Sequence, residues 1–284
     1  MPEGPELRKS RDDLQFLVGR YITRVEAVGG RYAKVPPVGL NDFTGSSKCA
    51  ECLYLKEYGR IEEVEVKGKF MWWSIRAAWS LWCTYGMTGR WSTTRDDKHC
   101  AVVLTHRGAA GDEACVYFND PRHFGTLKFV YDRDGDKTQA KLDALGPDML
   151  GSPPAPEQFI ARLGKKPNRT LAEALMDQSV VSGVGNYVKA EGLYMAALSP
   201  HRTVAECSVA ELMHLGTRLT QVMMESYTSG GATISTYRTV DGTKGGAQRR
   251  FAVYGNMTDP MGHPVIKEAT KDGRTTHWCP AIQK

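Results

Sequence analysis

Residues 177–191 read DQSVVSGVGNYVKAE, and this stretch does most to decide the fold of the C-terminal half of the chain. Gly183 and Gly185 permit tight turns and a close approach of the backbone to another group. We expect a helix to begin near Asn186, so that its free N–H groups and the Asn186 side chain can hold a phosphate. Dinucleotide-binding folds also place Gly-x-Gly before a helix, but they need a preceding strand, and none is expected here.

Helical signals surround this stretch on both sides. Residues 170–173 (TLAE) and 208–211 (SVAE) have the pattern of capping boxes. The first predicts a helix through Gln178, and the second predicts a long helix that ends near residues 229–231. Upstream, residues 145–156 (LGPDMLGSPPAP) are rich in proline and glycine, as is typical of a linker.

The N-terminal half has a different pattern, typical of short strands. Residues 5–18 predict one helix, with apolar side chains on one face and Gly19 at its end. Runs of β-branched and aromatic residues, separated by turn residues, then follow at 21–28, 61–66, 70–75, 80–85, 101–106, 114–118 and 125–131. Strands of this length and spacing indicate an antiparallel sandwich or barrel.

The sequence therefore predicts an α+β protein with two domains. We expect an N-terminal antiparallel β-sandwich with flanking helices over residues 2–145 and a linker over 146–156. A helical domain over 157–250 and a β-hairpin over 251–284, with strand-like pieces at 251–254, 264–266 and 275–278, would complete the chain.

Charge and composition limit the classes of function. The net charge is +5, and residues 151–284 hold 15 Lys and Arg against 11 Asp and Glu, which permits nucleic-acid binding without requiring it. No apolar run approaches the ~18–20 residues of a membrane helix. The N-terminus is charged where a signal peptide would be apolar, so we expect an intracellular protein without a membrane partner.

The seven cysteines are more typical of free thiols than of a disulfide framework. Cys49 and Cys52 have the spacing of metal ligands, but no second pair matches them. We interpret them as two thiols in a loop.

The N-terminus carries a candidate nucleophile. A small residue after Met1 permits removal of that methionine, which would leave the secondary amine of Pro2 free. An α-amino group titrates near pH 8, so part of it is unprotonated and reactive at neutral pH. Such an amine can attack the C1′ carbon of a deoxyribose, expel the base and form an iminium, after which the strand is cleaved by elimination.

Glu3 and Glu6 lie on one side of the expected first helical turn. Glu3 could act as general acid or base, and Glu6 could orient the sugar. A structural interpretation stays open, because proline and acidic residues are common in first helical turns for conformational and dipole reasons.

Residues 1–6, MPEGPE, resemble the opening of the Fpg/Nei family, which comprises formamidopyrimidine-DNA glycosylases and endonuclease VIII. Further motifs resemble the family in the same order over nearly the whole chain. The resemblance implies a DNA glycosylase with AP lyase activity by β,δ-elimination, a Schiff base on Pro2, and a helix–two-turn–helix over residues 177–191.

The resemblance also implies residues that bind DNA. Lys69 corresponds to a lysine that contacts phosphate beside the lesion, and Asn186 and Arg274 correspond to further phosphate ligands. Met87, Arg122 and Phe124 correspond to the side chains that fill the gap left by a flipped-out nucleotide, which offsets the cost of extruding it. Taken singly, each residue also fits an ordinary surface or core position.

The C-terminal end resembles the zinc finger of the family, with a departure. Met261 and Ile282 stand where cysteines are expected, and only Cys279 remains. A site built from His263, His277 and Cys279 would be a poor zinc signature. We therefore expect a zincless hairpin finger, with no metal and no cofactor.

Gly4 resembles the Nei branch, which favours oxidised pyrimidines as substrates and leaves oxidised purine derivatives open. The loop near residues 233–250 is too variable to interpret. The expected partner is damaged DNA, double-stranded or single-stranded, bound by a monomer. Two alternatives remain: a damaged-DNA-binding protein of the same fold without catalysis, and a small-molecule enzyme that uses Pro2 as a base.

Overall fold

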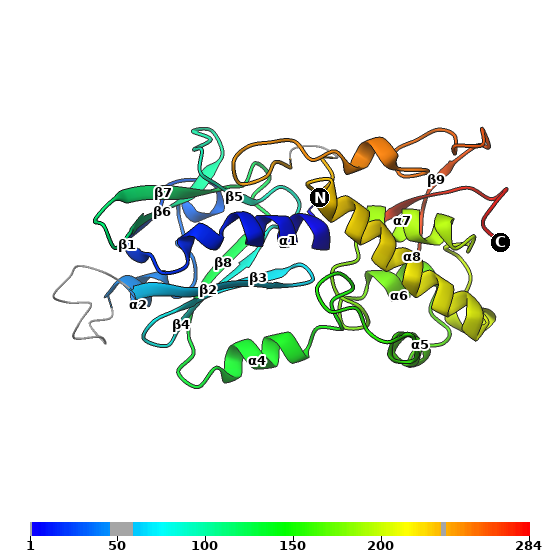
Figure 1. Cartoon of the computed structure of the whole chain (residues 1–284), viewed down its shortest axis with the longest axis horizontal. Coiled ribbons are helices and arrows are strands. Elements are labelled where there is room, and N and C mark those ends of the chain that lie inside the picture. The colour runs from blue at the N-terminus through cyan, green and yellow to red at the C-terminus, as the bar shows by residue number, and fades with distance from the viewer. Residues whose placement is uncertain (1, 46–58, 234–236) are drawn as a thin grey trace. The chain divides into compact units, whose positions relative to one another are not determined.

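The computed structural model describes residues 2–45, 59–233 and 237–284, which form two compact units (Figure 1). Cys49 and Cys52 lie outside the described residues. The first unit contains Pro2, Glu6–Asp143 and Ala232–Gly245. The second contains Glu3–Pro5, Ala144–Gly231 and Gly246–Lys284.

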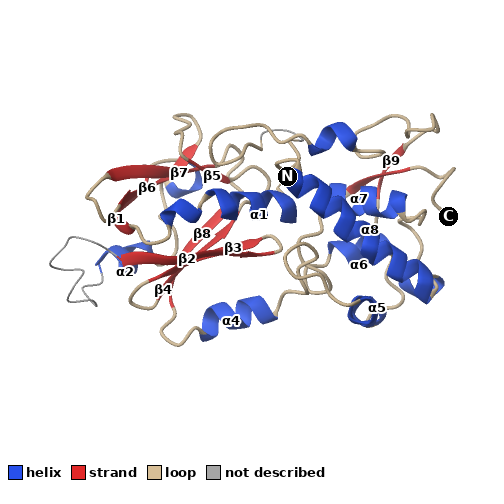
Figure 2. Cartoon of the chain, in the orientation of Figure 1, coloured by secondary structure: helices blue, strands red, loops and turns tan. Residues whose placement is uncertain are grey.

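Strands dominate the first unit, as Figure 2 shows in red. The strands are β1 Tyr21–Ala27, β2 Gly59–Lys67, β3 Phe70–Ile75, β4 Trp79–Thr84, β5 Arg90–Ser92, β6 Cys100–Arg107, β7 Glu113–Asn119 and β8 Thr126–Tyr131. Helices α1 Gly4–Asp13, α2 Leu40–Gly45 and α4 Asp136–Asp143 accompany them, with the 3-10 turns Gln15–Leu17 and Gly30–Tyr32. The sequence missed β5, because three residues are too few to show an alternating pattern.

The described strands of the first unit form one antiparallel sheet in the order β5-β7-β6-β1-β2-β3-β4-β8. Its two halves meet where β1 pairs with the first residues of β2. Trp91 of β5 lies 4.9 Å from Trp73 of β3 and 5.3 Å from Phe118 of β7, measured between ring centroids. Both halves thus share one core, which confirms the predicted antiparallel β domain, and each large buried side chain stabilises it by roughly 1.5–3 kcal/mol.

Helices dominate the second unit (blue in Figure 2). They are α5 Pro156–Gly164, α6 Leu171–Met176, α7 Asn186–Met195 and α8 Val209–Thr228, with the 3-10 turns Val204–Glu206 and Ala247–Arg250. Both predicted capping boxes form, at Thr170 and at Ser208. Gly192 lets α7 and α8 approach closely, because a Cβ there would lie 2.5 Å from Leu219 Cδ2.

A small hairpin of β9 Ile266–Ala269 and β10 Thr275–Trp278 closes the chain. The piece at residues 251–254, expected to be strand-like, is not a strand. Its N–H groups, from Ala252, Val253 and Tyr254, donate to the buried carboxylate of Glu191 at 2.7, 3.0 and 2.7 Å. Amides that converge on one carboxylate cannot also form a strand ladder.

Within the described part of the chain, no helix combines the length and apolar character needed to cross a bilayer.

Candidate functional site

The carboxylate of Glu3 caps the N-terminus of α7. Its two oxygens accept the backbone N–H groups of Tyr187 at 3.0 Å and Val188 at 3.3 Å. The side chain is buried, and the unpaired N–H groups and dipole of a helix N-terminus favour a negative charge there. The helix N-terminus that we expected to hold a phosphate thus holds Glu3 through two of its amides.

Glycines make room for this contact. A Cβ on Gly185 would lie 2.1 Å from Glu3 Cδ, so a side chain at position 185 would occupy the place of the carboxyl group. The N–H of Gly4 donates to the carbonyl of Gly183 at 2.9 Å, and Gly183 has a left-handed φ of 93°. The two glycines predicted to permit close approach therefore do so toward residues 3 and 4.

Asn186 and Arg274 come together in the second unit. The Asn186 Nδ2 atom donates to the carbonyl of Thr275 at 2.7 Å, directly beside Arg274 in the turn between β9 and β10. Arg274 itself is exposed. This part of the hairpin thus presents a cation to solvent while α7 fixes its backbone.

The same helix contains two buried charges that the sequence analysis did not single out, Lys189 and Glu191. Lys189 pairs with Asp272, and Glu191 holds residues 252–254. Every residue from Tyr187 to Leu193 is buried. The signal that could have revealed these two residues is a pair of charges inside an otherwise apolar helical stretch, since such charges need partners.

In the first unit, Asp120 builds the turn that presents Arg122 and Phe124. Its carboxylate accepts the hydroxyl of Thr88 and the N–H of Gly125, both at 2.7 Å. The N–H of Arg122 in turn donates to the Thr88 hydroxyl at 3.0 Å. These bonds satisfy the buried carboxylate and leave the Arg122 side chain outside the turn.

Met87, Arg122 and Phe124 lie on two neighbouring turns. A Cβ on Gly86 would lie 2.5 Å from the carbonyl carbon of Phe124, so the turn that carries Met87 packs against residue 124. Phe124 is 52% exposed, and the Arg122 guanidinium lies 5.2 Å from its ring centroid. The structure thus brings the three candidate gap-filling residues together, with an aromatic ring and a cation facing solvent.

Glu6 has a structural contact in the first unit. It is buried, and its Oε1 accepts the N–H of Ala232 at 2.7 Å. The Tyr237 hydroxyl donates to the Glu6 carbonyl at 3.2 Å, and burial raises the pKa of that phenol. Glu6 therefore anchors the segment after α8 to the β domain.

Pro2 and Lys69 also belong to the first unit. Pro2 is buried, and one peptide bond joins it to Glu3, which holds their Cα atoms about 3.8 Å apart. Lys69 is half-buried in the two-residue turn between β2 and β3, immediately before the strand at whose start it was expected.

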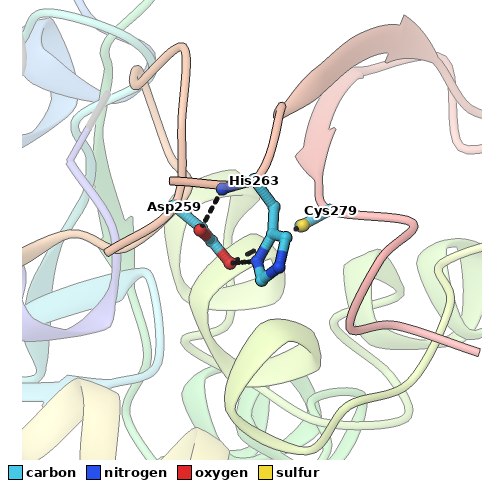
Figure 3. Close-up of side chains that lie close together, drawn as sticks. All are labelled: Asp259, His263 and Cys279. Atoms are coloured by element: carbon cyan, nitrogen blue, oxygen red, sulfur yellow. Dashed lines mark hydrogen bonds and ion pairs between the residues drawn. The ribbon is translucent and has the colours of Figure 1, made fainter. Parts of the chain in front are cut away.

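Three possible metal ligands lie together at the base of the hairpin: Asp259, His263 and Cys279, with donor atoms within 4.8 Å of one another (Figure 3). His277, which the sequence suggested, is not one of them; it packs on the Tyr254 ring at 4.8 Å between centroids. The sequence analysis missed Asp259, which lies 20 residues from Cys279 along the chain.

Hydrogen bonds already occupy the Asp259 carboxylate. Oδ1 accepts the N–H groups of Met261 and His263 at 2.9 and 2.8 Å, and Oδ2 accepts from the His263 ring and the Tyr194 hydroxyl at 3.0 and 3.1 Å. Burial raises the pKa of Asp259, but these hydrogen bonds outweigh it and set the pKa at about 2. A structural zinc site has four ligands. These three possible metal ligands, one of which is a carboxylate already occupied by hydrogen bonds, do not fit such a site.

We therefore expect the finger to be stable without metal. EDTA should leave the melting temperature unchanged. Asp259→Ala should lower it by a few degrees, because five hydrogen-bond donors, the Cys279 thiol among them, lose their acceptor. Differential scanning calorimetry of both proteins measures this. A fall in the melting temperature with EDTA, reversed by zinc, would contradict the expectation.

Comparison with known proteins agrees with these features. Residues 1–127 match the model of the formamidopyrimidine-DNA glycosylase N-terminal domain, and residues 145–238 match the formamidopyrimidine-DNA glycosylase H2TH domain. A formamidopyrimidine-DNA glycosylase of Thermus thermophilus is 37% identical over 235 residues, which cover 81% of this chain and 84% of the relative. The chain belongs to the formamidopyrimidine-DNA glycosylase family.

A second relative in this family, from Herpetosiphon aurantiacus, is 30% identical over 291 residues and covers 100% of both chains. The crystal structure of MutM (Fpg) from Thermus thermophilus has a TM-score of 0.80 at 32% identity and covers 99% of this chain and 98% of that one. A Lactococcus lactis Fpg mutant in complex with Fapy-dG containing DNA has a TM-score of 0.82 at 22% identity, with 100% of both chains covered, which shows a shared fold.

Family membership confirms the Fpg/Nei resemblance, whereas the Nei-like branch stays a prediction. It rests on Gly4, and the structure gives that glycine a packing role. A Cβ at position 4 would lie 2.6 Å from Met223 Cε and 3.0 Å from Gly183 Cα. A larger residue in this Fpg-family chain would therefore need Met223 and the 183 turn to shift.

Proposed function

We propose that this chain is a bifunctional base-excision-repair enzyme, a DNA glycosylase with AP lyase activity, and that it acts through a Schiff base on Pro2. The observation that carries the proposal is the position of Glu3. The residue next to the candidate nucleophile has a buried carboxylate bound to the first turn of α7 by two amides. Family membership supports the glycosylase part of the proposal.

In the proposed chemistry, the amine of Pro2 attacks C1′ of the damaged nucleotide, and the bond from C1′ to the base breaks. Glu3 gives a proton to the sugar ring oxygen or to the leaving base. The two amides of α7 then stabilise the negative charge that remains on Glu3. Loss of the acidified C2′ proton expels the 3′ phosphate, and a second elimination expels the 5′ phosphate.

Exposed and half-buried side chains supply the DNA-binding part of the proposal. Arg122 and Phe124, with Met87 beside them, would fill the space that the extruded nucleotide leaves, and stacking on Phe124 would offset part of its cost. Lys69, Asn186 and Arg274 would contact phosphates. Such contacts make binding strongly dependent on salt.

A panel of duplexes that differ only in one lesion tests the proposal. We propose oxidised pyrimidines as the preferred substrates, on the basis of Gly4, and a monomeric enzyme. The expected result is a nicked strand with phosphate at both ends, formed faster from 5-hydroxyuracil or thymine glycol than from 8-oxoguanine. Preference for oxidised purines would overturn the substrate class, and binding without excision of any lesion would favour the non-catalytic alternative.

Gly185→Ala should impair catalysis while the protein stays folded. Gly185 has a φ of −127°, which alanine also adopts, but the new Cβ would take the place of the Glu3 carboxyl group, 2.1 Å away. Because displacing a catalytic group by about 1 Å can cost 10²-fold, we expect a fall of about 10²-fold in single-turnover excision.

Gly164→Ala is the matched control, since a Cβ there meets nothing within 4 Å. It should excise at the wild-type rate and melt at a similar temperature. Equal rates for the two alanine variants would show that the position of Glu3 on α7 does not matter for excision.

A further inference from the structure

Lys189 and Asp272 form a buried ion pair in the second unit. The Lys189 Nζ atom lies 2.5 Å from Asp272 Oδ2, and the two side chains are 0% and 2% exposed. Removing both charges from water is costly, and the mutual attraction repays it only where the geometry is good. A lysine is almost never fully buried unless it is paired. The presence of this buried pair therefore calls for an explanation.

Asp272 organises the turn that carries Arg274. Its Oδ1 accepts the Thr270 hydroxyl at 2.5 Å and the N–H of Arg274 at 3.3 Å. The turn is closed by the N–H of Thr270, which donates to the Arg274 carbonyl at 2.9 Å. The Asp272 carboxylate therefore links the backbone of Arg274 on one side to Lys189 on the other.

Two residues of α7 bind the turn that carries Arg274. Asn186 binds the carbonyl of Thr275, and Lys189 binds Asp272, so the contacts fall on either side of Arg274. Positions 186 and 189 are three residues apart and share one helix face. The exposed guanidinium of Arg274 thus belongs to a turn whose backbone is bound to α7 at two points.

Lys189 also interacts electrostatically with Glu3 and Arg274. Burial lowers the pKa of Lys189, the carboxylates of Asp272 and Glu3 raise it, and the guanidinium of Arg274 lowers it. The buried ammonium therefore lies within electrostatic range of both the proposed acid and the proposed phosphate ligand.

We propose that Lys189 is a positioning residue that acts on DNA phosphate through Asp272 and Arg274 without touching DNA itself. The inference rests on the proposed function, because it assumes that Arg274 contacts a phosphate. It assigns the buried pair a part in DNA binding beyond the stability of the fold.

The salt dependence of DNA binding tests the role of Lys189. The binding constant Kobs is measured on a duplex that contains a stable abasic-site analogue, at several salt concentrations. The slope of log Kobs against log salt concentration reflects how many phosphates the protein neutralises. Neutralising one phosphate fewer reduces the slope by about 0.9. We expect Arg274→Ala and Lys189→Met each to reduce it by about 0.9, and the double variant to reduce it by the same 0.9, since both changes act on the same phosphate. A purely structural Lys189 would leave the slope of the folded protein unchanged.

Two further variants keep the test decisive. Asp272→Asn removes the charge of the other partner in the ion pair and should reduce the slope by the same amount. It replaces Lys189→Met if the Lys189→Met protein does not fold. Leu163→Ala removes a buried side chain of α5 in the same unit and should lower the melting temperature with no change in slope.

The outcomes separate the inference from the function on which it rests. If Arg274→Ala reduces the slope but folded Lys189→Met and Asp272→Asn do not, or if the double variant reduces it by about 1.8, the role of Lys189 is wrong while the DNA-binding function stands. If Arg274→Ala itself leaves the slope unchanged, the phosphate role of Arg274 is wrong and the inference falls with it.

Discussion

Glu3→Gln is expected to lower the rate of base excision by about 10²–10⁴-fold, the usual contribution of a general acid or base. Glutamine has nearly the same shape but cannot give up a proton, and its amide nitrogen cannot accept an N–H of α7. DNA affinity should change only a few-fold, because the buried Glu3 side chain is not among the proposed DNA ligands. Single-turnover excision and a binding titration on the same lesion duplex measure the two effects.

Glu6→Gln provides the comparison for that variant. Glu6 lies in α1, three residues after Glu3 in the sequence, and is equally buried. A glutamine oxygen at position 6 can still accept the N–H of Ala232. We expect a smaller loss of excision than for Glu3→Gln. The assignment of Glu3 would be wrong if the two variants excised equally fast, or if Glu6→Gln were the slower.

Blocking the amine of Pro2 is expected to have a comparably large effect on strand cleavage. An N-terminal Gly-Ser extension turns the nitrogen of Pro2 into a peptide nitrogen, which cannot attack C1′. Strand cleavage at an abasic site should fall by on the order of 10³-fold or more, as for other removed nucleophiles. Denaturing electrophoresis of the cleaved strand gives the rate. Pro2→Gly has a free primary amine in place of the secondary one, and its rate should lie between those of the wild-type and the extended protein.

Pro5→Ala is the matched control in the same hexapeptide. Its nitrogen lies in a peptide bond within the first turn of α1, so it should cleave at close to the wild-type rate. Cleavage by the extended protein at the wild-type rate would place the nucleophile elsewhere in the chain.

Local signals in the sequence predicted the parts of the structure that depend on local contacts. The capping boxes at Thr170 and Ser208 form as expected, and α7 begins at Asn186, because a cap needs only neighbours within a few residues. The β domain was also predictable, since runs of β-branched and aromatic residues separated by turn residues recur along residues 21–131.

Long-range partners explain what the sequence did not show. Residues 252–254 depend on Glu191, which is 61 residues away from Ala252, and Lys189 depends on Asp272, which is 83 residues away. The contact of Glu6 with Ala232 joins residues 226 positions apart. Patterns read within a short window cannot contain such pairs, so only the unusual charges themselves were visible.

The proposed mechanism requires a covalent bond between the amine of Pro2 and a DNA sugar, and borohydride trapping with peptide mapping detects that bond. The wild-type protein is incubated with an abasic-site duplex and borohydride, digested with trypsin, and the DNA-linked peptide is sequenced by mass spectrometry. We expect an adduct on residues 2–8, at Pro2, with Met1 removed. An adduct on a lysine such as Lys69, or cleavage of the DNA without any trapped peptide, would contradict it.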